Sequence, residues 1–178
     1  MSAMENVLIG MHPLLKSGPF GALLKLRSVT EEERNARQSA IQWLAYVGMA
    51  RKEHEIAKNL SYGDQRRLEI ARALASWPKL LLLDEPTAGM NPQETAQMTR
   101  FFDRMRKELD LTVLLIEHDM RVVMGISDQV AVLDHGEKIA DGSPVDVQRN
   151  QLVIEAYLGK SGAEAAAASS EARAGQGS

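Results

Sequence analysis

The sequence has 178 residues, 44% of them hydrophobic and 25% charged, and a net charge of −3 at pH 7, which are the proportions of a globular protein that can bury a core. A net negative charge without a concentrated positive surface argues against nucleic acid as a partner. The sequence has no cysteine, which excludes disulfides and thiolate metal sites, and its apolar runs are shorter than a bilayer-spanning helix, so we expect any membrane association to come through a partner.

Residues 1–60 are predicted to be mainly helical. A short apolar segment, residues 5–9, comes first. Further on, Thr30 followed by Glu33 has the pattern of a capping box, which predicts that a helix starts at Thr30. Gly48 is the expected end of that helix, because glycine is favoured just past a helix C-terminus.

The next predicted helix starts after Ser61 and ends before Pro78. Ser61 and Asp64 form another capping pattern, and an apolar stripe begins at Leu68. As structure, this is a well-capped amphipathic helix. The functional interpretation is an anion site suited to phosphate at the N-terminus of this helix, because Ser61 and the unhindered backbone of Gly63 lie there. The residues of this segment leave both interpretations open.

Four leucines at residues 80–83 predict a buried strand. The run has no polar face, so we expect cover on both sides, as in the interior of a parallel α/β sheet. Asp84 and Glu85 follow at the carboxyl end, where such sheets bind their ligands, and Pro86 ends the strand. The alternative is a buried strand whose acidic end is simply solvated.

A second buried strand is predicted at residues 111–116. The helix between the two strands starts at Asn91, with Glu94 completing its capping pattern. Strand, helix and strand in succession predict parallel pairing. His118 then follows the second strand, so we expect it at the same edge of the sheet as Asp84.

The remaining chain predicts a hairpin, a helix and a tail. Residues 129–133 form a strand, residues 134–137 a turn into a second strand, and residues 146–158 a closing helix. Residues 160–178 are small and polar without an apolar stripe, so we predict that this tail is disordered.

Three segments in this order, LSYGDQRR, LLLLDEPTAG and LLIEHD, resemble the ATP-binding subunits of ABC transporters, and the resemblance covers roughly residues 1–159. The segments ENVLIG, AGMNP, IEHDMRVVMGISD and AYLG are similar to the subunits that power branched-chain amino-acid uptake. The resemblance implies a partial α/β P-loop NTPase (ABC ATPase) fold with a mainly parallel sheet flanked by helices. It implies a helical signature lobe at 1–75 and a Walker B and switch-histidine part of the core at 76–159.

The resemblance also implies roles for three residues near the strand ends. Asp84 matches the Walker B aspartate that holds Mg²⁺, a hard ion that prefers oxygen ligands. Glu85 matches the catalytic carboxylate that orients or deprotonates the attacking water. His118 matches the switch histidine that reaches the γ-phosphate.

A signature loop that contacts ATP held by the opposite subunit is implied as well. The residues that match it are Ser61, Gly63 and Gln65, and residues 88–91, ending at Asn91, match the loop that links the two ATP sites. The sequence departs from the family pattern at Tyr62, Asp64 and Asn91. The negative charge of Asp64 beside an incoming γ-phosphate predicts weaker binding there.

The phosphate-binding loop G-x-x-x-x-G-K-[ST] is missing from the sequence. The only Gly-Lys-Ser starts at Gly159, and the position of the first glycine is occupied by Ile154, so we reject this candidate. The sequence therefore resembles the C-terminal part of such a subunit. We also expect uncovered apolar surface on the sheet.

The resemblance implies an ATP-binding and ATP-hydrolysing subunit of an ABC importer for branched-chain amino acids, with ATP and Mg²⁺ as cofactors. The implied partners are a second ABC ATPase subunit and membrane permease subunits at the cytoplasmic face of the plasma (inner) membrane, with no nucleic acid. We expect the chain alone to be inactive without the phosphate-binding loop. The alternative is a catalytically incompetent binding module that completes a partner's ATP site through its signature loop. An ABC protein of DNA repair or translation is disfavoured, because the sequence has no long coiled coil and no basic stripe.

Overall fold

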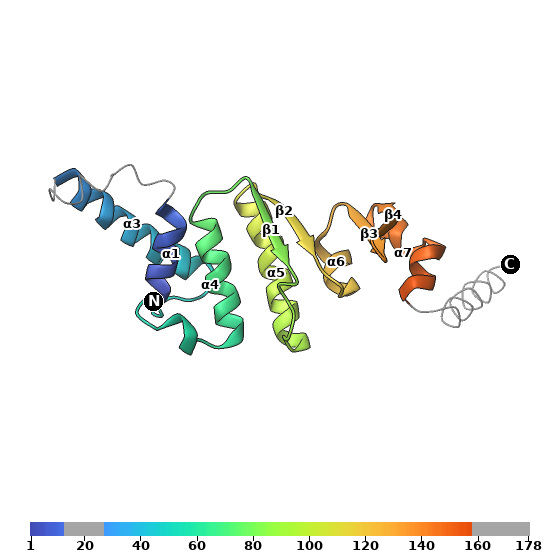
Figure 1. Cartoon of the computed structure of the whole chain (residues 1–178), viewed down its shortest axis with the longest axis horizontal. Helices are drawn as coiled ribbons and strands as arrows, with labels where there is room; N and C mark the ends of the chain where they lie inside the picture. The colour runs from blue at the N-terminus through green and yellow to red at the C-terminus, as the bar shows by residue number, and fades with distance from the viewer. Residues whose placement is uncertain (13–26, 158–178) are drawn as a thin grey trace. The chain divides into compact units, whose positions relative to one another are not determined.

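A computed structural model describes residues 1–12 and 27–157 (Figure 1). The tail predicted at residues 160–178 lies outside the described residues. The chain divides into two compact units, Met1–Ile116 and one that begins at Glu117. The predicted boundary near residue 75 stays a prediction. Among the helices that the structure describes, none has the length and apolar composition that crossing a bilayer requires.

Three helices pack against one another at the start of the first unit: α1 (Ala3–Met11), α3 (Arg27–Tyr46) and α4 (Tyr62–Leu74) (Figure 1). The sequence predicted an apolar segment at α1 but not the capping box that starts it. Ser2 Oγ accepts the Glu5 amide at 3.2 Å, and Glu5 Oε2 accepts the Ser2 amide at 2.8 Å. This reciprocal pair satisfies two amides that the helix itself cannot.

The predicted start of α3 is wrong and its predicted end is confirmed. The helix begins at Arg27, so Thr30 lies inside it and is not its N-cap. The three residues before Thr30 include neither proline nor glycine, so nothing in them prevents the helix from extending. Gly48, with φ 83°, follows the end of the helix in the left-handed conformation that glycine tolerates.

The crossing of α1 and α4 depends on a glycine. A Cβ atom built on Gly10 would collide with the carbonyl oxygen of Arg72 on α4. The two helix backbones therefore approach each other as closely as they do only because this position has no side chain.

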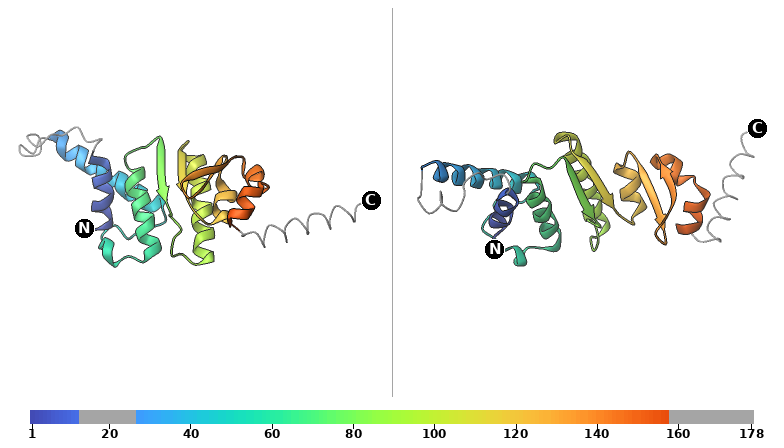
Figure 2. Two further views of the ribbon diagram at one scale, coloured as in Figure 1. Left: turned by 45° about the vertical axis from the view of Figure 1, so that its right-hand side comes forward. Right: turned by 45° about the horizontal axis from the view of Figure 1, so that its top comes forward.

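Two strands of the first unit pair in parallel, as predicted. β1 (Leu80–Asp84) and β2 (Thr112–Ile116) are in register from Leu80 opposite Thr112 to Asp84 opposite Ile116. They are joined by α5 (Pro92–Glu108), which lies against both strands in Figures 1 and 2. The buried face of α5 consists of Met98, Phe102 and Met105.

The prediction that both faces of the leucine strand are covered is wrong for the described residues. Leu81 faces the core and is 5% exposed, whereas Leu80 and Leu82 on the other face are 49% and 66% exposed. Leu114 and Ile116 of β2 continue this face at 53% and 59% exposure. Because α5 covers only one side of the two strands, the expected uncovered apolar surface is present on the other.

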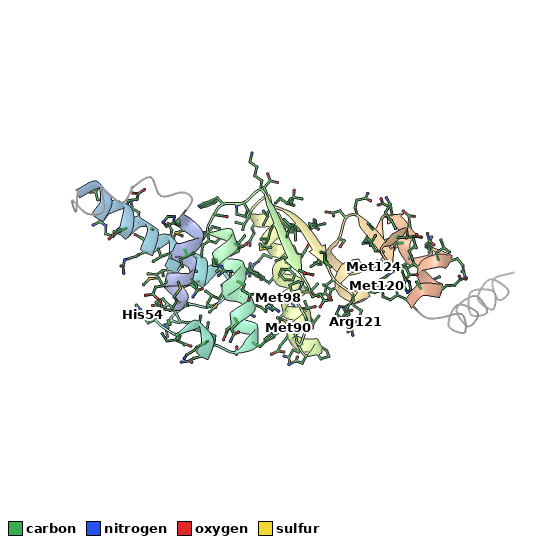
Figure 3. The ribbon with its side chains drawn as sticks, viewed as in Figure 1. His54, Met90, Met98, Met120, Arg121 and Met124 are labelled. Carbon is green, nitrogen blue, oxygen red and sulfur yellow. The ribbon has the colours of Figure 1, made fainter. Side chains whose placement is uncertain are left out.

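The second unit contains an antiparallel hairpin and short helices: α6 (Met120–Ile126), β3 (Val130–Asp134), β4 (Glu137–Gly142) and α7 (Pro144–Gln148). The hairpin confirms the predicted strand, turn and strand. Its turn residues His135 and Gly136 have φ angles of 49° and 85°, as a tight two-residue turn requires. Met120 and Met124 of α6 pack against a buried cluster that includes Val130, Val132 and Val147 (Figure 3).

The prediction of one continuous closing helix at residues 146–158 is wrong. The structure has α7 and then a separate helical segment at residues 151–157. Between them, Asn150 Oδ1 accepts the backbone amide of Leu152 at 2.9 Å. Asparagine favours such local bonds over the middle of a helix, so a new helix start replaces the predicted continuation.

Candidate functional site

The carboxyl end of β1 presents two exposed acidic side chains, Asp84 and Glu85. The Glu85 amide donates to the carbonyl oxygen of Ile116 at 2.9 Å, which extends the parallel ladder one residue beyond the strand. Glu85 also has a φ angle of 43°, in the left-handed region that non-glycine residues rarely adopt. Such strained residues concentrate at functional sites, which favours a chemical role for this end of the strand.

The N-terminus of α4 is the predicted signature loop, residues 60–65. Ser61 is the N-cap, as predicted, and its Oγ accepts the Asp64 amide at 3.2 Å. A Cβ atom built on Gly63 would meet nothing within 4 Å, so the space beside this backbone is open. Gln65 turns back and donates from Nε2 to the carbonyl oxygen of Leu60 at 3.0 Å, which fixes the loop from within.

Asp64 carries the negative charge of this loop, and Lys52 pairs with it. Lys52 Nζ lies 2.7 Å from Asp64 Oδ2, and Ser61 Oγ donates to the same oxygen at 2.9 Å. Burial is the largest effect and raises the pKa of Asp64, but the hydrogen bonds from Lys52 and Ser61 outweigh it and leave that pKa lowered. The same bond raises the pKa of Lys52. At neutral pH the two side chains therefore form an ion pair.

The structure brings the loop after β1 into contact with the signature loop. Gly89 has a φ angle of 74°, and a Cβ atom built on it would lie 3.5 Å from Cε1 of Tyr62. The Tyr62 hydroxyl accepts from Arg66 Nε at 3.2 Å and Nη2 at 2.9 Å. In the sequence, Tyr62 stands out only as a departure from the family pattern. Its contact with Gly89 follows from tertiary packing, for which the sequence has no signal.

Asn91 and Met90 end that loop (Figure 3). Asn91 Oδ1 accepts the amides of Gln93 and Glu94, each at 3.0 Å, and Glu94 Oε2 accepts the Asn91 amide at 2.9 Å. The predicted capping of α5 is therefore confirmed. The side-chain oxygen of Asn91 is used to start the helix.

His118 belongs to the second unit and has an exposed imidazole, with 71% of its side chain accessible. Its backbone amide donates to Glu117 Oε2 at 2.9 Å, and the Glu117 side chain is almost fully buried. Asp119 then caps α6 by accepting the amide of Arg121 at 2.9 Å. The predicted meeting of His118 with Asp84 and Glu85 stays a prediction.

The described residues contain no group of three or more His, Cys, Asp or Glu side chains placed to hold a metal ion. Mg²⁺ commonly binds through one or two carboxylates, with phosphate oxygens and water as its other ligands. The exposed carboxylate of Asp84 fits that arrangement, in which a nucleotide supplies most of the ligands.

Comparison with known families gives two matches along the chain. Residues 6–88 match the family described as "ABC transporter". Residues 137–163 match the family described as "Branched-chain amino acid ATP-binding cassette transporter". The first match spans Ser61, Asp84 and Glu85, and the second lies in the second unit.

Two curated relatives are similar over most of the chain. The high-affinity branched-chain amino acid transport ATP-binding protein LivG of Escherichia coli K12 is 44% identical over 160 residues, which are 90% of this chain and 63% of LivG. The corresponding protein BraF of Pseudomonas aeruginosa is 43% identical over the same shares. The chain thus spans less than two thirds of the length of these relatives.

Solved structures share the fold. The ADP conformation of MJ1267, an ATP-binding cassette of an ABC transporter, matches with a TM-score of 0.70 and 27% identity over 90% of this chain and 63% of that chain. The cbiO1 protein of Clostridium perfringens, part of the ABC transporter complex cbiONQ, matches with a TM-score of 0.68 and 28% identity over 86% of this chain and 55% of that chain.

Proposed function

The chain belongs to the ATP-binding proteins of ABC transporters, and on that premise we propose that it contributes to a MgATP site that powers branched-chain amino-acid import. The observation that carries the proposal is that the first unit contains two polar sites, each at the end of a secondary-structure element. One is the strained acidic end of β1, and the other is the capped start of α4. The names of LivG and BraF, and the family matched at residues 137–163, support the substrate class.

The proposal assigns each end a separate task. Asp84 holds Mg²⁺ together with phosphate oxygens and water, and Glu85 accepts a proton from the attacking water or orients it. ATP supplies the phosphoryl group that is transferred to water. Ser61 and the open backbone at Gly63 receive the phosphates of a nucleotide bound to a second ABC subunit, because a helix N-terminus favours anions. His118 contacts the γ-phosphate.

We further propose that the chain works as a peripheral subunit at the cytoplasmic face of the plasma (inner) membrane. Permease subunits and a second ATP-binding subunit are the proposed partners. The names of the relatives describe them as ATP-binding proteins of amino-acid transport, which supports an assembly of this kind.

A second candidate function is a binding module that completes the ATP site of a partner without turnover of its own. Ser61 caps α4 and the space beside the backbone of Gly63 is open, whereas the sequence contains no G-x-x-x-x-G-K-[ST] loop that would bind the phosphates. This candidate uses the same signature loop and differs only in whether Glu85 performs chemistry.

One experiment separates the two candidates. The chain is added to an ABC ATP-binding protein that has an intact G-x-x-x-x-G-K-[ST] loop, and phosphate release from MgATP is measured. Both candidates predict a faster rate, and Ser61→Arg, which fills the loop with a bulky side chain, removes the gain. A gain that survives Glu85→Gln supports the binding module, and a gain lost with Glu85→Gln supports the catalytic subunit. No change on mixing contradicts the proposed function.

A further inference from the structure

The signature loop contains an acidic side chain at the place where, in the proposed function, it meets the phosphates of a nucleotide. Asp64 is the third residue of α4, and its carboxylate belongs to the same short loop as Ser61 and Gly63. An unpaired carboxylate there repels a phosphate and weakens its binding. Lys52, the residue that pairs with Asp64, lies outside the loop and has no assigned role.

The bond between Ser61 and Asp64 has a fixed direction. Asp64 is ionised at neutral pH because its pKa is lowered, so its carboxylate can only accept. Ser61 must therefore give its single hydroxyl proton to Asp64 Oδ2, at 2.9 Å. The same hydroxyl oxygen accepts the Asp64 amide as the helix cap. The orientation of Ser61 is thus determined by Asp64, and the position of Asp64 by Lys52.

Lys52 itself is held by the turn between α3 and α4. Its amide donates to the Met49 carbonyl oxygen at 3.2 Å, and its carbonyl oxygen accepts the Glu55 amide at 3.1 Å. Met49 is fully buried, which anchors this turn in the core. The ammonium group of Lys52 therefore reaches Asp64 from an ordered backbone and not from a free loop. The other charged groups that act on the pair are Glu55 and, from α4, Arg67.

We propose that Lys52 is a positioning residue of the signature loop, which holds Asp64 and neutralises its charge so that the loop can receive the phosphates of a nucleotide. The inference rests on the proposed function, in which the signature loop contacts ATP held by a partner subunit. The role depends on the ion pair: the negative charge of Asp64 repels an approaching anion, and the positive charge of Lys52 neutralises it.

The first test examines the pair in the full chain without nucleotide. Carbon-13 NMR of the Asp64 carboxyl group, assigned by its loss in Asp64→Asn, follows its titration in the wild type and in Lys52→Met. Loss of Lys52 removes a hydrogen bond that lowers the pKa of Asp64, so we expect that pKa to rise. Lys52→Arg keeps the pKa near the wild-type value, and Lys58→Met, which removes a charge from the same segment without touching Asp64, leaves it unchanged. An unchanged Asp64 pKa in Lys52→Met overturns the proposal.

The second test measures the concentration of MgATP that gives half-maximal stimulation of the partner described above. Lys52→Met raises that concentration about tenfold, since a carboxylate beside the phosphates is left unpaired. Asp64→Asn lowers it, because the Lys52 ammonium group is then unpaired and attracts the phosphates, and the double variant stays near wild type, because both charges of the pair are gone. Lys52→Arg and Lys58→Met stay near wild type. Equal values for wild type and Lys52→Met overturn the proposal.

The two tests separate the inference from the proposed function. If the wild-type chain gives no stimulation at all, the proposed function fails, and the NMR titration alone decides whether Lys52 positions Asp64. If stimulation occurs but is indifferent to Lys52, the proposed function stands and the inference fails.

Discussion

At the scale of single residues, the signature loop depends on the protonation of Asp64. The pKa of Asp64 is lower in the folded protein than its ordinary value of 3.8, so Asp64 stabilises the folded protein at pH values above 3.8. This stabilisation is lost as the pH falls through the lowered pKa. The ion pair is partly exposed, with 36% of the Lys52 and 20% of the Asp64 side chain accessible, so its contribution is modest.

We therefore predict a pH-dependent effect of Asp64→Asn. At pH 7 the variant is less stable than the wild type by about 0.5–1 kcal/mol, and the difference shrinks as the pH falls below 3.8 and through the lowered pKa of Asp64 in the folded protein. Urea unfolding at pH 7 and at successively lower pH values measures this. A difference that stays constant between them would show that the charge of Asp64 is not what stabilises the loop.

The residues at this scale also mark what the sequence could and could not predict. The caps at Ser61 and Asn91 were predictable because a cap is a local pattern of three or four residues. The start of α3 was not, because the capping pattern at Thr30 competes with a backbone that is free to continue as helix. Lys52 was missed because it lies 12 residues before Asp64, beyond the reach of any local pattern.

At the scale of elements, the packing of α1 on α4 depends on Gly10. We predict that Gly10→Ala destabilises the protein by about 1–3 kcal/mol, because the added methyl group collides with the Arg72 carbonyl oxygen and one helix must shift. Gly63→Ala is the matched control within α4, where a methyl group meets open space and helix propensity improves slightly. Chemical unfolding of both variants checks this. Equal stability of the two variants would mean that α1 and α4 are not in close contact at Gly10.

The elements themselves were largely predictable, and the cover of the sheet was not. Continuous apolar runs indicated the strands at residues 80–83 and 111–116, and the helix between them indicated their parallel pairing. A run of leucines carries no information on which face is covered. Only the position of α5 on one side reveals that Leu81 is buried and Leu82 is not.

At the scale of the whole molecule, the apolar face formed by Leu80, Leu82, Leu114 and Ile116 is exposed. Exposed apolar surface on a sheet favours association with other apolar surfaces. We predict that Leu82→Thr lowers the binding of a hydrophobic dye and lowers self-association, with a stability change within about 0.5 kcal/mol.

Leu81→Thr is the control for that prediction, because Leu81 is adjacent on the same strand but faces the core. Its loss costs about 2–4 kcal/mol, as for other truncations of buried leucine. Dye fluorescence, sedimentation and unfolding are measured for both variants. A large loss of stability in Leu82→Thr would contradict the exposure of this face.

The central claim, that this chain meets a partner's nucleotide through its signature loop, is tested most directly by sedimentation velocity. The chain is mixed with an ABC ATP-binding protein that carries a G-x-x-x-x-G-K-[ST] loop, with and without Mg²⁺ and a non-hydrolysable ATP analogue. We predict a heterodimer that forms only with the nucleotide and is lost in Ser61→Arg but retained in Lys58→Met. Absence of a nucleotide-dependent complex, or an undiminished complex with Ser61→Arg, would contradict the account.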